Sequence, residues 1–374
     1  MAESNAVQEL IVILSFLIGS SVFAFAWSPL LSHLLYKYKV IKSPKVELAH
    51  THADTTKAKT PIMGGILVIL TVAIITYAFN WERSFTWVPI GVMLLAAGLG
   101  AIDDLLNIYG TRRRNRSVAQ VLTLIRVHQN YFVRLWLLIT LPWTIIKRVS
   151  LVFGSHPGKG VYVHEKLLFQ FLAGGIAAWW IYFKLGPAWH FLNIPFIGQY
   201  HVGWLIIPII IFMIMFTANA VNIADGMDGL AGGMLISTYG ALALLSWTSG
   251  FTELTVLNAT VVGALVTYTY FNIKPARFMM GDVGSLGLGA LLAINALAIG
   301  ENVSLLFLAF VFYVEATTVI IQVFGRVLLK RRIFRMAPLH HHFELIGWSE
   351  EKTIMRFWIV HALMVLVGIW ISIQ

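Results

Sequence analysis

The stretch NAVNIADGMDGLAGG at residues 219–233 follows the apolar run LIIPIIIFMIMF at 205–216. The run has the composition of a membrane-spanning helix, yet it ends in two aspartates among glycines. An ionisable group close to the membrane is costly, and it usually faces a helix bundle or a wet cavity. The stretch therefore predicts a spanning helix that carries carboxylates to a functional surface.

The composition of the whole chain supports a membrane protein. Of its 374 residues 58% are hydrophobic and 12% are charged, whereas soluble domains have about 45–50% and about 25%. Runs that can cross the ~30 Å hydrocarbon core as helices lie at 10–36, 62–79, 87–102, 167–183, 202–223, 230–247, 254–273, 283–299, 303–324 and 354–373. We expect an all-α polytopic membrane protein, one domain over 1–374, with about ten transmembrane helices and no cysteine chemistry.

The basic residues predict how the chain is oriented. If the N-terminus is periplasmic, nearly all lysines and arginines fall in cytoplasmic loops, and Arg83 and Lys184 are the exceptions. The positive-inside rule therefore places both termini in the periplasm. Topology and attraction to anionic lipids account for the net charge of +10, so no nucleic-acid partner is needed.

The segment 111–159 fits this pattern least well. It begins with arginines (GTRRRNRS, 110–117) and continues as FVRLWLLITLPWTII at 132–146, which is short for a span and contains Arg134 and Pro142. We interpret it as a cytoplasmic insertion with an interfacial or re-entrant element. A single crossing here would place the basic loop 325–335 in the periplasm, which argues against one.

The aspartates gather on one predicted face. Asp103 and Asp104 end the third span, Asp225 and Asp228 end the fifth, and Asp282 begins the eighth. All five fall at the cytoplasmic side, and His340, His341 and His342 lie in the last cytoplasmic loop. Separate segments thus deliver ionisable groups to one surface, which we interpret as an active site.

Each element also has a structural explanation. Asp103–Asp104 can be a solvated helix end, DGMDG a turn, Asp282 an N-cap and the histidines a loop tract. All four would then lie on one side by chance, beside glycines that suit a close backbone approach to a ligand.

The residue types predict phosphate chemistry. Carboxylates are hard oxygen ligands that favour Mg²⁺, with Mn²⁺ as a second option. Lys57, Lys59 and Lys166, near the same face, can neutralise phosphate charge. Because phosphoryl transfer needs mainly positioning and charge neutralisation, a cytosolic activated phosphate donor and a lipid phosphate acceptor fit this surface.

Six motifs resemble one enzyme family over most of the chain. They are TPIMGG at 60–65, AIDDLLNI at 101–108, NAVNIADGMDGLAGG, FNIKPA at 271–276, MGDVGSLGLG at 280–289 and RIFRMAPLHHHFELIGW at 332–348. Together they resemble the phospho-N-acetylmuramoyl-pentapeptide transferase branch of the polyprenyl-phosphate N-acetylhexosamine-1-phosphate transferase superfamily. The resemblance implies a ten-helix protein of the bacterial inner membrane, often dimeric, that makes lipid I and UMP from UDP-MurNAc-pentapeptide and undecaprenyl phosphate.

The resemblance also implies residue roles. Asp282 is similar to the Mg²⁺ ligand and Asp103 to the proposed base, with Asp104 beside it. Asp225, Asn222 and Asp228 match catalytic and nucleoside-side positions. The remaining matches are His340 and His341 for the pyrophosphate, with His342 next to them; Lys57 and Lys166 for substrate; and Asn272 near the nucleoside. We expect Glu344 to lie outside this cluster.

Three features depart from the family pattern. Asn107 stands where a lysine is expected, which shifts phosphate neutralisation to Lys166 or to Arg112–Arg116. The link after the acid pair is longer by roughly 40 residues. Met279 stands where an aromatic residue would stack on uracil, so either Met279 contacts the base or Phe278 takes over the stack.

Two alternatives to this function stay open. One is a sister transferase that uses UDP-GlcNAc or another UDP-hexosamine. The other is an ion- or proton-coupled lipid transporter, which would release no UMP.

Overall fold

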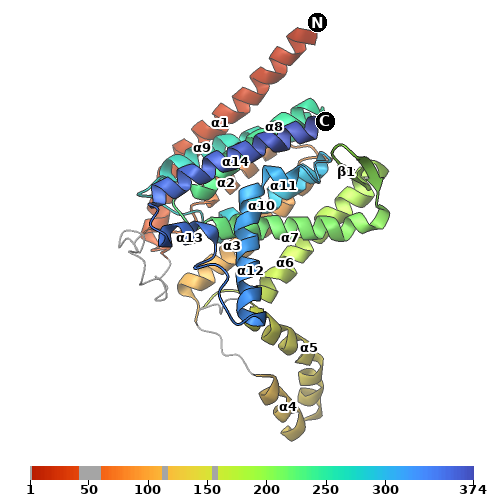
Figure 1. Cartoon of the computed structure of the whole chain (residues 1–374), viewed down its shortest axis with the longest axis vertical. Helices are drawn as coiled ribbons and strands as arrows, with labels where there is room; N and C mark the ends of the chain where they lie inside the picture. Colours follow the sequence, from red (N-terminus) through yellow and green to blue (C-terminus); the bar gives the residue numbers. More distant parts are fainter. Residues whose placement is uncertain (1, 42–59, 112–116, 154–158) are drawn as a thin grey trace.

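The computed structural model describes residues 2–41, 60–111, 117–153 and 159–374 (Figure 1). Lys57, Lys59 and the Arg112–Arg116 cluster lie outside these ranges. The described chain is almost entirely helical, and the predicted all-α, multi-pass class is confirmed.

The long helices follow the predicted apolar runs. They are α1 (Ala2–Lys37), α2 (Ile66–Phe79), α3 (Trp87–Tyr109), α6 (Val163–Trp179), α7 (Ile206–Ala224), α8 (Leu230–Thr248), α9 (Thr252–Asn272), α10 (Gly281–Ala298), α12 (Phe310–Leu328) and α14 (Glu350–Ile373). Within the described ranges, nine helical segments are long and apolar enough to cross a membrane, and α2, with 14 residues, is the shorter tenth.

Short elements connect these helices. A π-helical turn (Trp180–Leu185) extends α6, and a hairpin of β1 (Phe191–Ile194) and β2 (Gly198–His201) leads towards α7. We did not anticipate this hairpin, which lies near the C-terminus in Figure 1. The remaining helices are α4 (Val118–Val127), α5 (Tyr131–Phe153), α11 (Leu305–Leu308) and α13 (Leu339–Leu345).

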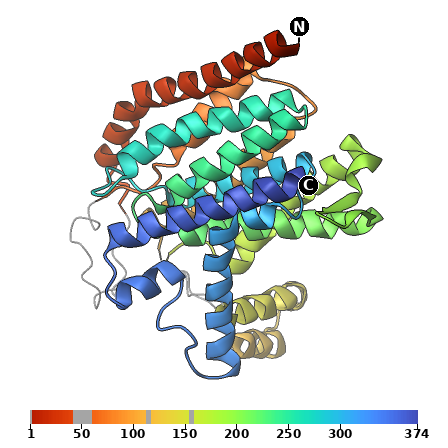
Figure 2. The same ribbon diagram turned by 45° about the horizontal axis from the view of Figure 1, so that its top comes forward.

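The predicted single span 303–324 is wrong in one respect, because the helix breaks at Ala309. The short helix α11 ends there, and α12 runs in a new direction across α7 (Figures 1 and 2). At the break, the carbonyl of Leu308 is no longer part of a continuous helix. The Thr238 hydroxyl donates a hydrogen bond to it at 2.9 Å. A side chain of α8 thus satisfies the interrupted backbone.

Burial differs strongly among the spans. In α9 and α10, 89% of the apolar stretch that could span the membrane is buried inside the protein, whereas in α1 only 11% is buried. The central helix α10 packs against both α3 and α7. The ends of α3 and α7, with Asp103, Asp104 and Asp225, therefore lie around the first turn of α10.

Candidate active site

Lys166 lies at the centre of the polar cluster. Its Nζ is 2.6 Å from Oδ2 of Asp103 and 2.7 Å from Oδ2 of Asp282. The lysine belongs to the first turn of α6, and the two acids belong to the end of α3 and the start of α10. One ammonium group therefore bridges two carboxylates that the sequence separates by 179 positions.

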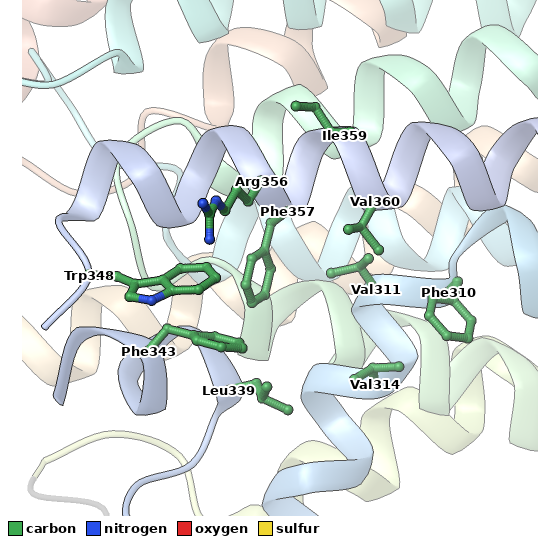
Figure 3. Close-up of a pocket in the computed structure, with 10 residues that line it drawn as sticks. All are labelled: Phe310, Val311, Val314, Leu339, Phe343, Trp348, Arg356, Phe357, Ile359 and Val360. Carbon is green, nitrogen blue, oxygen red and sulfur yellow. The ribbon is translucent and has the colours of Figure 1, made fainter. Parts of the chain in front are cut away.

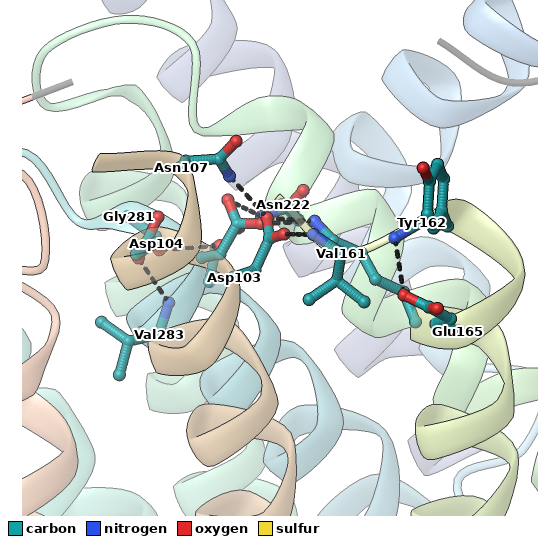
Figure 4. Close-up of polar contacts among 12 residues, drawn as sticks. Asp103, Asp104, Asn107, Val161, Tyr162, Glu165, Asn222, Gly281 and Val283 are labelled. Atoms are coloured by element: carbon teal, nitrogen blue, oxygen red, sulfur yellow. Dashed lines mark hydrogen bonds and ion pairs between the residues drawn. The ribbon is translucent and has the colours of Figure 1, made fainter. Parts of the chain in front are cut away.

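Asp103 is held by further donors from two directions. The Val161 N–H donates to its Oδ1 at 2.6 Å, and the Asn107 amide donates to its Oδ2 at 3.0 Å (Figure 4). Only 3% of Asp103 is exposed. Asn107 thus orients Asp103 through a hydrogen bond from a neutral amide. Among the described residues, Lys166 provides the positive charge beside Asp103.

Asn222 connects Asp282 to the end of α7. Its amide donates to Oδ1 of Asp282 at 3.1 Å and to the Ser285 hydroxyl at 2.8 Å. Lys166 and Asn222 therefore fix both oxygens of Asp282. Four helix ends, from α3, α6, α7 and α10, meet at this carboxylate, as the predicted common face required.

Asp104 and Asp225 hold the backbone at the start of α10. The Val283 N–H donates to Oδ2 of Asp104 at 3.2 Å (Figure 4). The Gly281 N–H donates to Oδ2 of Asp225 at 3.2 Å. The first turn of a helix has N–H groups without intrahelical partners, and carboxylates from two other helices satisfy them here. Asp282 lies inside the helix and is not its N-cap, so that structural explanation is wrong.

The TPIMGG motif supports the same turn from the other side. Gly64 and Gly65 donate their N–H groups to the carbonyls of Met279 and Met280 at 2.7 and 2.9 Å. A Cβ on Gly65 would lie 2.3 Å from Cα of Gly284, so only glycine allows this approach. The motif therefore fixes the loop that carries Asp282.

The histidines are positioned by an acid that sequence reasoning missed. Glu315, fully buried in α12, accepts from the N–H groups of Leu339 and His340 at 2.8 and 3.1 Å. Nδ1 of His340 lies 3.2 Å from the same carboxylate, and its Nε2 side lies against Gly226 in the DGMDG turn. A lone acid inside the apolar run 310–321 was the available signal, since such a group needs a partner in a membrane.

His341 and His342 have different surroundings. Nδ1 of His341 is 2.7 Å from Glu344, which corrects the expectation that Glu344 lies outside the cluster. His342 is half-buried, with its ring 6.4 Å from that of Phe334. His340 and His341 therefore lie together, with ring centroids 4.3 Å apart, while His342 faces another neighbour.

The other face of α13 lines an apolar cavity of about 490 Å³ between α12 and α14. Figure 3 shows Leu339, Phe343 and Trp348 along one wall, with Arg356 above the Trp348 ring. The guanidinium carbon lies 4.3 Å from that ring. The short helix that bears the histidines is thus anchored to the membrane-spanning helices by side chains on its other face.

The predicted nucleoside side is tied together by backbone contacts. Oδ1 of Asn272 accepts from the Gly229 N–H at 2.8 Å, and its amide donates to the Phe278 carbonyl at 2.9 Å. Asp228 accepts from the Ala276 N–H at 3.4 Å. Asn272 and Asp228 thus join the end of the DGMDG turn to the loop that precedes Asp282.

Burial distinguishes the two residues, Met279 and Phe278, that we considered for contact with uracil. Phe278 is 1% exposed, and its ring lies between those of Tyr268 and Phe271 at 5.9 Å from each. Met279 is only partly buried. Phe278 cannot take over a stack on uracil without leaving the core, so that alternative is wrong.

An ion pair at the rim fixes the FNIKPA loop to α14. Nζ of Lys274 lies 2.9 Å from Glu351 and 3.3 Å from Glu350. The hydrogen bond to Glu351, together with the neighbouring Glu350, holds the pKa of Lys274 above its usual value although partial burial opposes this. Lys274 is therefore a cation at neutral pH.

The donor set suits a hard cation, although no cage is preformed. In the part of the chain that the structure describes, no three side chains of His, Cys, Asp or Glu are grouped to hold a metal ion. Mg²⁺ needs only one or two carboxylates, because substrate phosphates and water complete its shell. Asp282, whose carboxylate lies at the meeting point of the four helix ends, fits such a role.

Comparison with known proteins decides the family. The chain is 33% identical to the phospho-N-acetylmuramoyl-pentapeptide-transferase of Chloroflexus aggregans over 353 residues, which is 91% of this chain and 84% of that protein. The enzyme of the same name from Geobacillus sp. (strain WCH70) is 31% identical and is matched over 98% of both chains. The chain belongs to the phospho-N-acetylmuramoyl-pentapeptide transferase family.

This membership agrees with the other comparisons and with the site. The transferase of Levilactobacillus brevis is 31% identical, over 84% of this chain and 85% of its own. A family model described as glycosyl transferase family 4 matches residues 159–300. That range holds Lys166, Asn222, Asp225, Asp228 and Asp282, so the family prediction made from the motifs is confirmed.

Proposed function

We propose that the protein transfers phospho-MurNAc-pentapeptide from UDP-MurNAc-pentapeptide to undecaprenyl phosphate at the cytoplasmic face of a bacterial inner membrane. The products are lipid I and UMP. The observation that carries this proposal is the convergence of Asp103, Lys166, Asn222 and Asp282 from four helix ends, in a chain of this transferase family. Such a site at the membrane surface can be reached by a soluble donor and by a lipid acceptor.

In the proposed reaction, a phosphate oxygen of undecaprenyl phosphate attacks the sugar-side phosphorus of the donor. A new P–O bond forms while the bond from that phosphorus to the bridging oxygen breaks, and UMP leaves with the electron pair. Lys166 is placed to neutralise the phosphate charge that gathers in this step. Because the acceptor phosphate is already ionised at neutral pH, Asp103 has little proton to remove and acts by arranging charge.

We assign Asp282 as the ligand of Mg²⁺, with Mn²⁺ as a substitute. When bound, the ion would neutralise phosphate oxygens of the donor. Asn222 orients the Asp282 carboxylate, while Asp104 and Asp225 keep the first turn of α10 in place. His340 and His341, which contact Glu315 and Glu344, would donate to the pyrophosphate once the donor is bound.

The nucleoside would lie against the DGMDG turn and Met279. A thioether is polarizable and adapts to irregular shapes, which suits contact with a base in place of an aromatic ring. We retain the homodimer, which rests on the family resemblance, and the periplasmic termini, which rest on the charge pattern, as parts of the proposal.

The test uses purified protein, Mg²⁺ and undecaprenyl phosphate, with UMP measured after addition of one of two donors. UDP-MurNAc-pentapeptide should give acceptor-dependent UMP release and UDP-GlcNAc should give none. Release with UDP-GlcNAc alone would favour the sister transferase. Without acceptor, labelled UMP should not exchange into the donor, because direct attack forms no enzyme-bound phosphosugar.

A further inference from the structure

The charge of the protein is concentrated in one segment. No acidic residue occurs between Asp104 and Glu165. The basic residues in that interval are Arg112, Arg113, Arg114, Arg116, Arg126, Arg134, Lys147, Arg148 and Lys159. Nine positive and no negative side chains give +9, against +10 for the whole chain, so the rest of the protein is nearly neutral.

The described part of this segment is an ordered helical hairpin. α4 begins with a capping box in which Ser117 and Gln120 bond to each other's backbone. Val121, Ile125 and Leu137 form a small core between α4 and α5 that is separate from the core of the spanning helices. Figures 1 and 2 show the hairpin projecting from the bundle beside the end of α12.

A second apolar face of α5 has no partner among the described residues. Its members follow the helical repeat of about 3.6 residues, so they share one side of the helix. They are Tyr131, Leu135, Leu138, Ile139, Ile145 and Ile146, each between 43% and 72% exposed. Within the described ranges α5 is not among the helices that are long and apolar enough to cross a membrane.

We propose that this outer face of the α4–α5 hairpin binds anionic phospholipids at the cytoplasmic membrane surface. Arg126 and Arg134 would contact headgroup phosphates while the apolar face of α5 enters the acyl-chain boundary. A basic helix with exposed aliphatic and aromatic residues is the type that lies in the membrane interface. An acidic soluble partner would satisfy the arginines and leave the second apolar face of α5 in water.

The hairpin is also connected to the active site. The Trp143 ring packs edge-on against His164 at 4.8 Å, and Nζ of Lys147 lies 5.6 Å from the centre of the Tyr162 ring. Tyr162 follows Val161, which donates to Asp103, and His164 lies two residues before Lys166. Lipid binding by the hairpin would therefore steady the end of α6 that carries Lys166. This second step rests on the proposed function.

The chain contains no cysteine, so a fluorophore on a single introduced cysteine reports on one position. Ile139→Cys labelled with bimane would be reconstituted in phosphatidylcholine vesicles with and without about 30 mol% phosphatidylglycerol. We expect a blue shift and quenching by shallow spin-labelled lipids only with phosphatidylglycerol. A label on Gln129→Cys, in the exposed turn between the helices, should stay in water.

Neutralising the arginines tests the role of charge. In the labelled protein, Arg126→Gln with Arg134→Gln should lower the ratio of docked to free hairpin roughly fivefold for each cation removed. The matched control, Lys37→Gln with Lys184→Gln, removes two exposed cations away from the hairpin and should leave the signal unchanged. A label that stays in water with both vesicle types, or one that is buried equally in both, would overturn the proposal.

Activity provides a separate readout for the connection to α6. UMP release by the unlabelled protein should rise about threefold or more with phosphatidylglycerol, and the double arginine variant should lose this gain. Docking without any change in turnover would refute the connection to Lys166. An absence of UMP release in every vesicle would refute the proposed function, and the fluorescence result would still decide the lipid site.

Discussion

The site end of the bundle and the α4–α5 hairpin use opposite solutions to the same problem of placing polar groups beside a membrane. At the site, Asp103, Lys166 and Asp282 are largely buried, and Lys166 and Asn222 bond to the two carboxylate oxygens of Asp282. In the hairpin, Arg126 and Arg134 are exposed, and one apolar face of α5 has no partner among the residues that the structure describes. Substitutions should therefore act on chemistry in the first region and on membrane association in the second.

The largest expected effect is at Asp282. Asp282→Asn should lower turnover at least ~100-fold, because a neutral amide is a poor Mg²⁺ ligand and loses its charge attraction to Lys166. Initial rates of UMP release at saturating Mg²⁺ measure this. Glu301→Gln, an acid-to-amide change beyond the other end of α10, is the control and should keep normal turnover.

Lys166→Met should come next, with two distinguishable consequences. Removing the bridging ammonium leaves two close carboxylates without their shared cation, which should destabilise the protein by about 3 kcal/mol and lower turnover about 100-fold. Adding Asp103→Asn to this variant should restore much of the thermal stability without restoring turnover. A double variant that recovers turnover as well would show that Lys166 acts only on folding.

Glu315→Gln should have an intermediate effect. The amide keeps the shape of the side chain but accepts less strongly from the α13 backbone and from His340, so turnover should fall about tenfold. The donor KM and the thermal midpoint, measured together, separate this from unfolding. Glu344→Gln, which weakens the contact with His341, should give a smaller loss.

Met279→Ala should mainly change donor binding. We expect its donor KM to rise severalfold while turnover stays within about twofold, since contact with the base is remote from the reacting phosphorus. Phe278→Ala should instead lower the thermal midpoint, because it opens a cavity in the core. An unchanged donor KM in stable Met279→Ala would remove this residue from the nucleoside side.

The smallest effect is expected for the small core of the hairpin. Leu137→Ala should leave turnover in neutral detergent and the thermal midpoint of the spanning helices nearly unchanged, because this cluster is separate from the main core. Loss of most turnover in neutral detergent would contradict the division into two regions.

Some features of the helix bundle could be predicted from the sequence and others could not. The span positions and the common face of the aspartates follow from apolar length and loop charge, and these are local properties of the chain. The bridge from Lys166 to both Asp103 and Asp282 does not, because it depends on how α3, α6 and α10 pack. The break at Ala309 has no proline to mark it, and its compensation comes from Thr238 in another helix.

The importance of Glu315 could have been predicted in part from the sequence. A single acid in an apolar run indicated a buried partner, but its identity as His340 depended on the packing of α13 against α12. The Phe278 alternative failed for a similar reason, since only packing places its ring between Tyr268 and Phe271.

One measurement tests the central claim most directly: the stoichiometry of UMP and phosphoglycosyl lipid formed from UDP-MurNAc-pentapeptide and undecaprenyl phosphate by the wild-type protein and by Asp282→Asn. We predict equal amounts of the two products from the wild type with Mg²⁺, and at least ~100-fold less of both from the variant. Wild-type rates in the folded variant, or UMP release without the lipid product, would contradict the account.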